Sequence, residues 1–188
     1  MSKILVDTID TRSGTSNITI GSSNASQITL KSGATLTNFP ANKPYFFGKK
    51  ASDSTISRRT QTVITGLTED EVDSNSAFDG TTFTVPSGEG GVYYFYANIF
   101  TDYSGIGADG EEVQIKFRKN NSYSGMPETT VQRPNDGLYN KLSVNQSIIQ
   151  NLSAGDTFEI SAYTSDFNAS GSATISGTNT FFMGYKLA

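Results

Sequence analysis

Cysteine, histidine and tryptophan are absent from this chain of 188 residues. Without cysteine there are no disulfides and no thiol chemistry, and without histidine there is no imidazole to act as a general base. Zinc sites with the usual cysteine and histidine ligands, Cys and His nucleophile pairs and the Ser-His-Asp triad are therefore excluded. Any function has to be built without these centres.

Strong charge and long apolar runs are also missing. The net charge is -4 and the pI is about 4.8, so the chain lacks the basic stripe that a nucleic-acid-binding surface requires. No apolar run approaches the roughly 18 residues that cross a bilayer, and MSKILVDTID has an acidic residue where a signal peptide needs its apolar centre. We expect no nucleic-acid partner, no membrane insertion and synthesis in a cytoplasm.

Serine, threonine, glycine and aromatic residues are abundant instead, with 18 Gly, 9 Tyr and 12 Phe. No long stretch repeats apolar residues at helical spacing, and short runs of alternating character are separated by turn residues. This pattern predicts an all-β protein whose main domain, residues 44–188, is a two-sheet sandwich. The candidate strands are Tyr45–Lys50, Arg59–Thr65, Thr82–Pro86, Gly91–Thr101, Val113–Lys119, Lys141–Gln150, Thr157–Thr164, Ser172–Ser176 and Thr180–Leu187.

A short internal repeat lies near the N-terminus, ITIGSSNASQ followed by ITLKSGATLT, in which Ile18 aligns with Ile28 and Ile20 with Leu30. Each copy has an apolar-Thr-apolar triplet, which is typical of a short strand with one buried face, followed by turn residues. Its few apolar side chains cannot order this segment alone. We expect residues 18–43 to form a β-repeat stalk and linker in which three chains bury these four side chains; hairpins packed on the main domain are the alternative.

Four passages of the main domain carry motifs. FDGTTFTVPSGEGGVYYFYANI (residues 78–99) contains Gly-x-Tyr-x-Phe, and IKFRKNNS (115–122) ends in a Lys-Asn turn. LSAGDTFEISAY (152–163) starts with Leu-x-x-Gly-Asp, and TFFMGYKL (180–187) contains Phe-x-Gly. In this order and spacing they resemble the globular heads of complement component one q and of the tumour necrosis factor family. The resemblance implies that residues 44–188 form a ten-stranded jelly roll that associates as a trimer.

The predicted strand from Val92 to Phe100 has two apolar faces. Tyr93 and Phe95 alternate with Val92, Tyr94, Tyr96 and Phe100, so both faces carry large side chains. One face can fill the sandwich core, whereas the other needs a cover outside the domain. The resemblance places Tyr93 and Phe95 inside. A thick core under loops is the alternative.

We therefore expect a trimer interface on the second face of this strand, extended by the last strand and by the stalk. Its candidate residues are Val92, Tyr94, Tyr96, Phe100, Phe182, Ile18, Ile20, Ile28 and Leu30.

A β-repeat stalk joined to a jelly-roll head looks like a bacteriophage virion fibre, and ILVDTID followed by the Ile-Thr repeats is similar to stems of marine or cyanobacterial phages. This likeness implies a non-enzymatic, homotrimeric virion protein of a tailed phage, made in the host cytoplasm, released by lysis and adhering to a host-surface glycan. A capsid decoration trimer or head fibre without a receptor role is one alternative. A capsular polysaccharide depolymerase is the second.

The first 17 residues carry an apolar patch that the repeat does not continue in register. Its residues are Ile4, Leu5, Val6 and Ile9. We expect residues 1–17 to attach the protein to a socket on another virion protein.

The receptor surface is expected at the end of the head far from the stalk. Counting strands that alternate in direction places four segments there: Gly66–Thr81, Asp102–Glu112, Ser153–Asp156 and the turn near Gly177. The segment DYSGIGADGEE is preferred, because it combines an aromatic platform with oxygen acceptors, a pairing that suits a sugar. A solvated hairpin without a ligand is the alternative. The candidate contacts are Asp102, Tyr103, Asp109, Glu111 and Glu112.

Carboxylates cluster in two predicted loops, Glu69, Asp70, Glu71 and Asp73 in one and Asp109, Glu111 and Glu112 in the other. A glycosidase needs only two carboxylates about 5 to 10 Å apart, which keeps the depolymerase alternative open. These clusters lie between Gly and Ser, so we expect solvated loops, no catalytic residues and no metal site. Calcium, which takes oxygen ligands from such loops, is the one cofactor left open.

Overall fold

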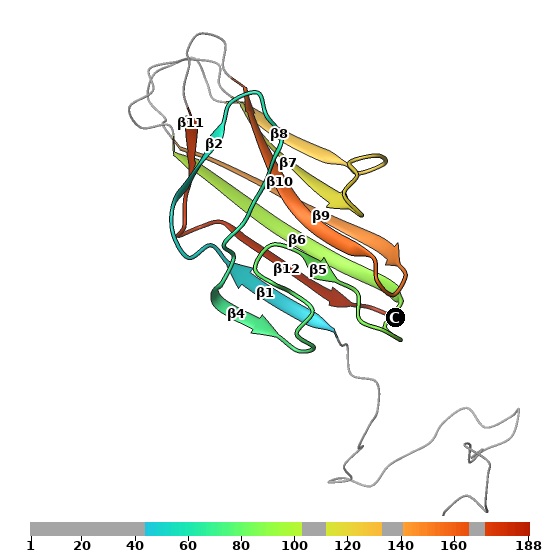
Figure 1. Ribbon diagram of the computed structural model, residues 1–188. Helices are drawn as coiled ribbons and strands as arrows, with labels where there is room; N and C mark the ends of the chain where they lie inside the picture. Colours follow the sequence, from blue (N-terminus) through green and yellow to red (C-terminus); the bar gives the residue numbers. More distant parts are fainter. Residues whose placement is uncertain (1–43, 103–111, 133–140, 166–171) are drawn as a thin grey trace, which may run out of the picture. The chain divides into compact units, whose positions relative to one another are not determined.

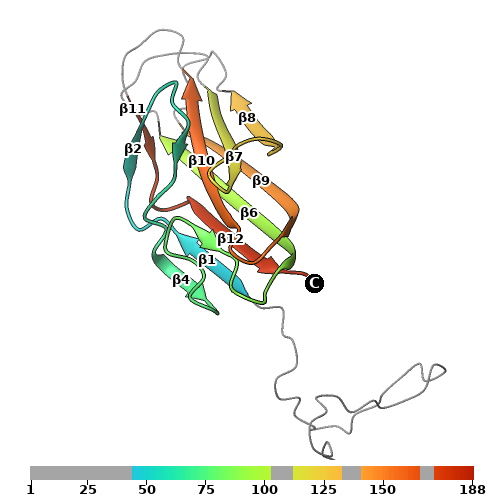
Figure 2. The same cartoon turned by 45° about the vertical axis from the view of Figure 1, so that its right-hand side comes forward.

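The computed structural model describes residues 44–102, 112–132, 141–165 and 172–188. These residues form twelve strands and no helix, in two facing sheets (Figures 1 and 2). The first sheet contains β1 (Tyr45–Lys49), β2 (Ser54–Ser57), β4 (Glu69–Asp73), β6 (Gly91–Asp102), β9 (Lys141–Leu152), β11 (Ser172–Ile175) and β12 (Phe181–Lys186). The second sheet contains β3 (Thr62–Val63), β5 (Phe83–Thr84), β7 (Glu112–Lys119), β8 (Glu128–Gln132) and β10 (Thr157–Ser165).

Strand β6 lies in the middle of the first sheet. One of its edges pairs with β9 along its whole length, from Gly91 opposite Leu152 to Asp102 opposite Lys141. Its other edge is shared, because β12 pairs with the first part of β6 and β11 with its last two residues. Strands β1 and β2 then pair with β12 and β11, and β4 pairs with β1. All these pairings are antiparallel, as a jelly roll requires.

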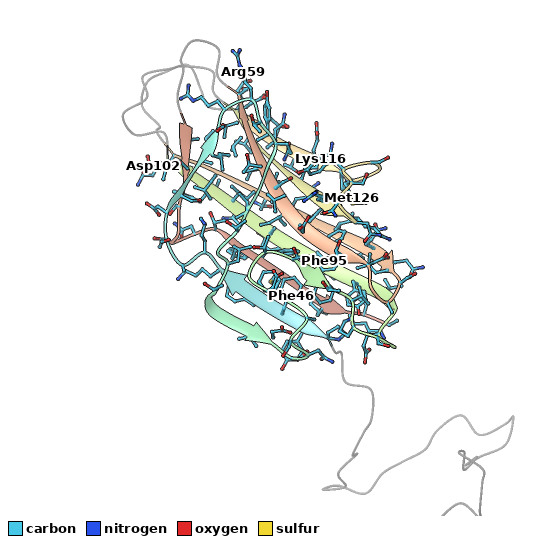
Figure 3. The ribbon with its side chains drawn as sticks, in the orientation of Figure 1. Phe46, Arg59, Phe95, Asp102, Lys116 and Met126 are labelled. Carbon is cyan, nitrogen blue, oxygen red and sulfur yellow. The ribbon has the colours of Figure 1, made fainter. Side chains whose placement is uncertain are left out.

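Aromatic rings fill the space between the sheets. The ring of Phe95 lies 4.2 Å from that of Phe158 across the sandwich, and that of Phe46 lies 4.9 Å from that of Phe83 (centroid distances; Figure 3 labels Phe46 and Phe95). A Cβ atom on Gly184 would lie 2.7 Å from Cε1 of Phe95 and 2.8 Å from Cε1 of Phe46. The Phe-x-Gly motif therefore uses glycine because the ring of Phe95 occupies the place of a side chain.

The strand count differs from the ten predicted. Strands β2, β4 and β8 were missed, and the predicted strand Arg59–Thr65 is reduced to the two residues of β3. Strand β4 was predicted as an acidic loop; instead it pairs with β1. Strands β4 and β8 are edge strands, and each pairs with a single neighbour. Each contains one large apolar side chain, Val72 in β4 and Val131 in β8. The alternation of apolar and polar residues that predicts a strand is therefore weak there.

These missed strands also change which loops lie together. Where the chain enters the head, Lys186 N–H donates to the carbonyl of Pro44, and Val92 N–H donates to that of the C-terminal Ala188. Asp102 pairs with Lys141 and Glu112 with Ser165, at the opposite end of the sandwich. The ends of β6, β7, β8 and β10 therefore meet far from Pro44 (Figure 1).

Three of the four segments predicted at the far end lie elsewhere. The turn Ser153–Asp156 follows Leu152, which pairs with Gly91 beside the C-terminus. The segment Gly66–Thr81 contains β4 and returns to Tyr45, whose carbonyl accepts a hydrogen bond from Ser74 N–H. Gly177 lies at the side of the first sheet, donating to Asp53 Oδ1. The expected alternation of strand direction along the chain was wrong as well, because β11 and β12 are both antiparallel to β6 and therefore run in the same direction.

Two of the sequence motifs meet in a hydrogen-bonded clasp near the chain entrance, formed by Lys119, Asn120, Ser153, Asp156 and Thr157. Asn120 has φ of 49°, its Nδ2 donates to Asp156 Oδ1 at 2.8 Å, and its Oδ1 accepts from Thr157 N at 2.8 Å. Asp156 Oδ2 also accepts from Ser153 N at 2.9 Å and forms an ion pair with Lys119 at 2.9 Å. The Lys-Asn turn and the Leu-x-x-Gly-Asp motif are thus two halves of one structural contact.

The clasp predicts a pH dependence of stability. The Asn120 amide is the main cause that lowers the pKa of Asp156 from 3.8 to about 2; Ser153 N–H and Lys119 add to it, and burial opposes it. Because the folded-state pKa is depressed, the contribution to stability is fully present above pH 3.8 and is lost as the pH falls through about 2. We expect Asp156→Asn to lower the melting temperature at pH 7, and the difference from wild type to shrink toward pH 2. A difference independent of pH would contradict this.

Candidate functional site: the outer face of the first sheet

The side chains of β6 divide into an inner and an outer row, as predicted. Tyr93, Phe95, Ala97 and Ile99 are completely buried in the sandwich, and the prediction that Tyr93 and Phe95 lie inside is confirmed. The hydroxyl of Tyr93 donates to the carbonyl oxygen of Glu89, so its polar atom is satisfied at the edge of the core. Burial, with the Glu89 carboxylate, raises the pKa of Tyr93 to about 12.

One predicted interface residue is misplaced. Phe182 is completely buried in the core, where its ring lies 4.8 Å from that of Phe46, so its assignment to the outer face was wrong. The side chains of β12 alternate, and the side of Gly184 is the inner one because the ring of Phe95 lies over it. Phe181, Met183 and Tyr185 therefore belong to the outer face.

The outer face of the first sheet carries many aromatic and apolar side chains, mostly on β1, β6 and β12. Rings contact one another across strands: Tyr94 with Tyr185 at 5.4 Å, Tyr96 with Phe181 at 5.7 Å and Phe47 with Phe181 at 5.8 Å. The large side chains on this face, named the aromatic face below, are Tyr45, Phe47, Val72, Val92, Tyr94, Tyr96, Phe100, Ile149, Phe181, Met183 and Tyr185.

Several of these side chains are open to solvent. Tyr45 is 41% exposed, Val72 is 51% exposed and Ile149 is 63% exposed, and the β6 and β12 members of the face are half-buried. Contiguous apolar surfaces of this kind usually mark a contact with another molecule. The aromatic face is therefore the candidate functional site of the head.

The outer face of the second sheet has the opposite character. Lys116 forms an ion pair with Glu128 at 3.3 Å, and Arg118 pairs with Glu159 at 2.8 Å (Figure 3 labels Lys116). Thr82 Oγ1 donates to the same carboxylate of Glu159 at 2.8 Å. Such a surface is satisfied by its own hydrogen bonds and by water. Within the part of the chain that the structure describes, the apolar face that needs a cover is therefore that of the first sheet.

A polar group interrupts the aromatic face. Asn98, on β6 between the outward positions of Tyr96 and Phe100, accepts a hydrogen bond at Oδ1 from Ser143 Oγ at 2.8 Å. Its Nδ2 donates to the carbonyl oxygen of Asn179 at 2.7 Å. These three residues, Asn98, Ser143 and Asn179, are named the polar strip below.

The structure places two of the five receptor-contact candidates. Asp102 ends β6 and forms an ion pair with Lys141 at 3.5 Å, and Glu112 begins β7 and accepts at Oε1 from Gln114 Nε2 at 3.4 Å. Both lie at the end of the sandwich opposite Pro44. Tyr103, Asp109 and Glu111 lie outside the described residues, as do the stalk candidates Ile18, Ile20, Ile28 and Leu30 and the attachment candidates Ile4, Leu5, Val6 and Ile9.

In the first acidic cluster, the structure describes the carboxylate of Asp73, and this carboxylate has a structural role. Asp73, at the end of β4, accepts hydrogen bonds from the backbone N–H groups of Asn75 and Phe78 and so shapes the turn that follows. Among the described residues, no group of three or more acidic side chains could hold a metal ion. None of the described residues belongs to a helix that could span a bilayer.

No protein-family profile and no curated protein sequence matches this chain. Solved structures do match it. Murine APRIL at pH 5.0 has a TM-score of 0.51 and 10% identity, over 77% of this chain and 98% of that one. The globular domain of zebrafish complement 1qA protein has a TM-score of 0.48 and 18% identity, over 78% and 98%.

Eiger TNF from S. frugiperda has a TM-score of 0.48 and 14% identity, over 77% of this chain and 91% of that one. At these identities the similarity shows the fold and nothing more. Among these three structures, the match to murine APRIL is the one that supports the fold assignment. The head is a jelly roll of the kind found in complement component one q and tumour necrosis factor proteins.

The adjacent residues Phe181 and Phe182 provide a matched test of the two faces. Phe182→Ala is expected to lower the free energy of unfolding by about 3 to 5 kcal/mol, because it empties a fully buried site. Phe181→Ala is expected to cost the folded monomer much less and to weaken self-association instead. Urea unfolding at a concentration where the chain is monomeric measures the first effect, and light scattering measures the second. Equal losses of monomer stability would contradict the assignment.

Proposed function

We propose that this chain is a non-enzymatic structural protein of a bacteriophage virion, a homotrimeric fibre whose heads associate through the aromatic face. The observation that carries the proposal is the contrast between the two outer faces. One is polar and satisfied by ion pairs, and the other exposes rings from β1, β6 and β12 in one sheet. A surface of this composition is stable in water when it is buried by further protein.

A second copy of the chain is the cover that the surface itself favours. Tyrosine and methionine side chains are enriched in the cores of protein interfaces, and the aromatic face contains Tyr45, Tyr94, Tyr96, Tyr185 and Met183. Closed symmetry also limits the number of copies in the assembly. When copies are related by a rotation axis, each can bury its aromatic face, and no aromatic face is left exposed to recruit further copies. The sequence resemblance to trimeric heads selects three copies.

The far end of the head is the part proposed to meet the host. The chain enters at Pro44, beside the C-terminal Ala188, and Asp102 and Glu112 lie at the opposite end. If the N-terminal residues attach the protein to the particle, that opposite end is carried outermost. Loops at such an end can vary without disturbing the sandwich, which suits contact with a host-surface glycan.

Replacing Tyr96 with Lys tests the association. Tyr96 is half-buried in the middle of β6, and its ring lies 5.7 Å from that of Phe181. An ammonium group buried there in three copies loses water and meets like charges, at a cost of several kcal/mol per trimer. We expect Tyr96→Lys to be monomeric or aggregated by light scattering, with an unchanged β-sheet spectrum.

The matched control is Thr130→Lys, which adds the same charge to an exposed position of β8 in the second sheet. It is expected to remain trimeric. A trimeric Tyr96→Lys variant would show that the aromatic face is not the interface.

The virion assignment has its own test. Antibody against the full chain is expected to label purified phage particles, and the purified full chain, added before the phage, is expected to reduce adsorption to host cells by competing for the glycan. Unlabelled particles would overturn the proposal. Labelled capsids with unchanged adsorption would instead identify a capsid decoration trimer without a receptor role.

A further inference from the structure

The polar strip lies where the rings of β6 and β12 meet the outward row of β9, which is mostly polar and contains Ser143, Asn145, Ser147 and Asn151. Asn98 separates Tyr96 from Phe100 along the outer row of β6, and in register it lies between Phe181 of β12 and Asn145 of β9. An apolar side chain at this position would make the outer row of β6 apolar from Val92 to Phe100. An amide there contributes little to the hydrophobic stabilisation of an interface, so its presence calls for a different role.

The hydrogen bonds of Asn98 fix the orientation of its side-chain amide and leave that amide able to pair with the same group of another copy. Within the described residues, Oδ1 accepts one hydrogen bond, from Ser143, and Nδ2 donates one, to Asn179. A side-chain amide has two acceptor sites and two N–H donors, so one of each remains. Another copy of the same strip can pair with both, whereas an aromatic ring can pair with neither.

We propose that the polar strip sets the register of the trimer, because the three copies associate most stably in the alignment that brings their polar strips together. This inference rests on the proposed trimer. If one copy is displaced relative to the other two by two residues along β6, roughly 7 Å, its Tyr96 or Phe100 lies over Asn98 of a neighbouring copy. That alignment buries amide groups without partners, which costs free energy, while the apolar contacts alone would tolerate it. A single buried asparagine selects the register of coiled coils for the same reason.

The test compares the wild-type chain with Asn98→Leu. The chain has no cysteine, so Ala188→Cys gives one labelling site per protomer, at the exposed C-terminus. Mixed donor and acceptor labels on the full chain report the distance between the C-termini, and mass photometry reports the number of chains. Wild type is expected to show three chains and one population of transfer efficiency.

Asn98→Leu is expected to stay associated, with a dissociation rate no faster than that of wild type. It is expected to show at least two populations of transfer efficiency in place of one. Ser143→Ala, which removes the donor to Asn98 with a change of one atom, is expected to show a smaller second population. Asn145→Leu is the matched control, because it places the same side chain on the same face outside the polar strip. It is expected to behave as wild type.

The outcomes separate this inference from the proposed function. A wild-type chain that does not form trimers contradicts the proposed function. If the wild type is trimeric and Asn98→Leu shows one population, or dissociates into monomers, the strip does not set register. Two populations in Asn145→Leu as well would show that any added apolar side chain has this effect, and would also overturn the inference. A circular dichroism spectrum of each variant confirms that the sandwich is folded.

Discussion

A strand in the middle of a sheet has two faces, and a sandwich of two sheets covers only one of them. Strand β6 is central, and it carries large apolar side chains on both faces. Its inner row, from Tyr93 to Ile99, is completely buried against the second sheet. The fold therefore buries half of the apolar surface of β6 and leaves the other half on the outer face of the first sheet. Among the described residues, the outer face of the second sheet is polar instead.

The motifs that carry the family resemblance are structural. Gly184 leaves room for the ring of Phe95, and Asn120 with Asp156 joins the end of β7 to the start of β10. Gly91 adopts a φ of 155°, and a Cβ atom there would meet the C-terminal Ala188. These residues hold the sandwich of this chain together through contacts between its strands and turns. For that reason they predicted the fold, and they carry no information about a ligand.

The central strands could be predicted from the sequence because their side chains alternate strongly. Strands β6, β7, β9 and β10 lie within one or two residues of their predicted ends. The edge strand β4 could not be predicted, since its sequence, Glu69–Asp73, is mostly acidic and its place depends on pairing with β1. Three of the four loops expected at the far end were misplaced, both because β2, β4 and β8 were missing and because strand direction does not alternate along the whole chain: β11 and β12 run in the same direction.

The face of the last strand could not be assigned from alternation alone. Phe181 and Phe182 are equally apolar, and either could point inward. The signal that decides between them is Gly184, because a glycine opposite a large ring marks the inner face, and Phe182 shares its side of the strand. The outward position of the β6 residues from Val92 to Phe100 was therefore predicted correctly, and that of Phe182 on β12 wrongly. Its contributions from Tyr45, Phe47, Val72 and Ile149 depend on pairings that only the folded structure shows.

The aromatic face also sets an order of events. Its side chains come from β1, β4, β6, β9 and β12, which are spread along the sequence and meet only when the first sheet is complete. The core that holds this sheet, centred on Phe46, Phe95 and Phe182, uses the opposite side of the same strands and needs no second chain. The core of the head thus forms within one chain, and in the proposed assembly the rings that the finished sheet still exposes are buried in a later step. The polar strip belongs to the same stage, since Asn98, Ser143 and Asn179 are brought together only by the pairing of β6 with β9 and β12.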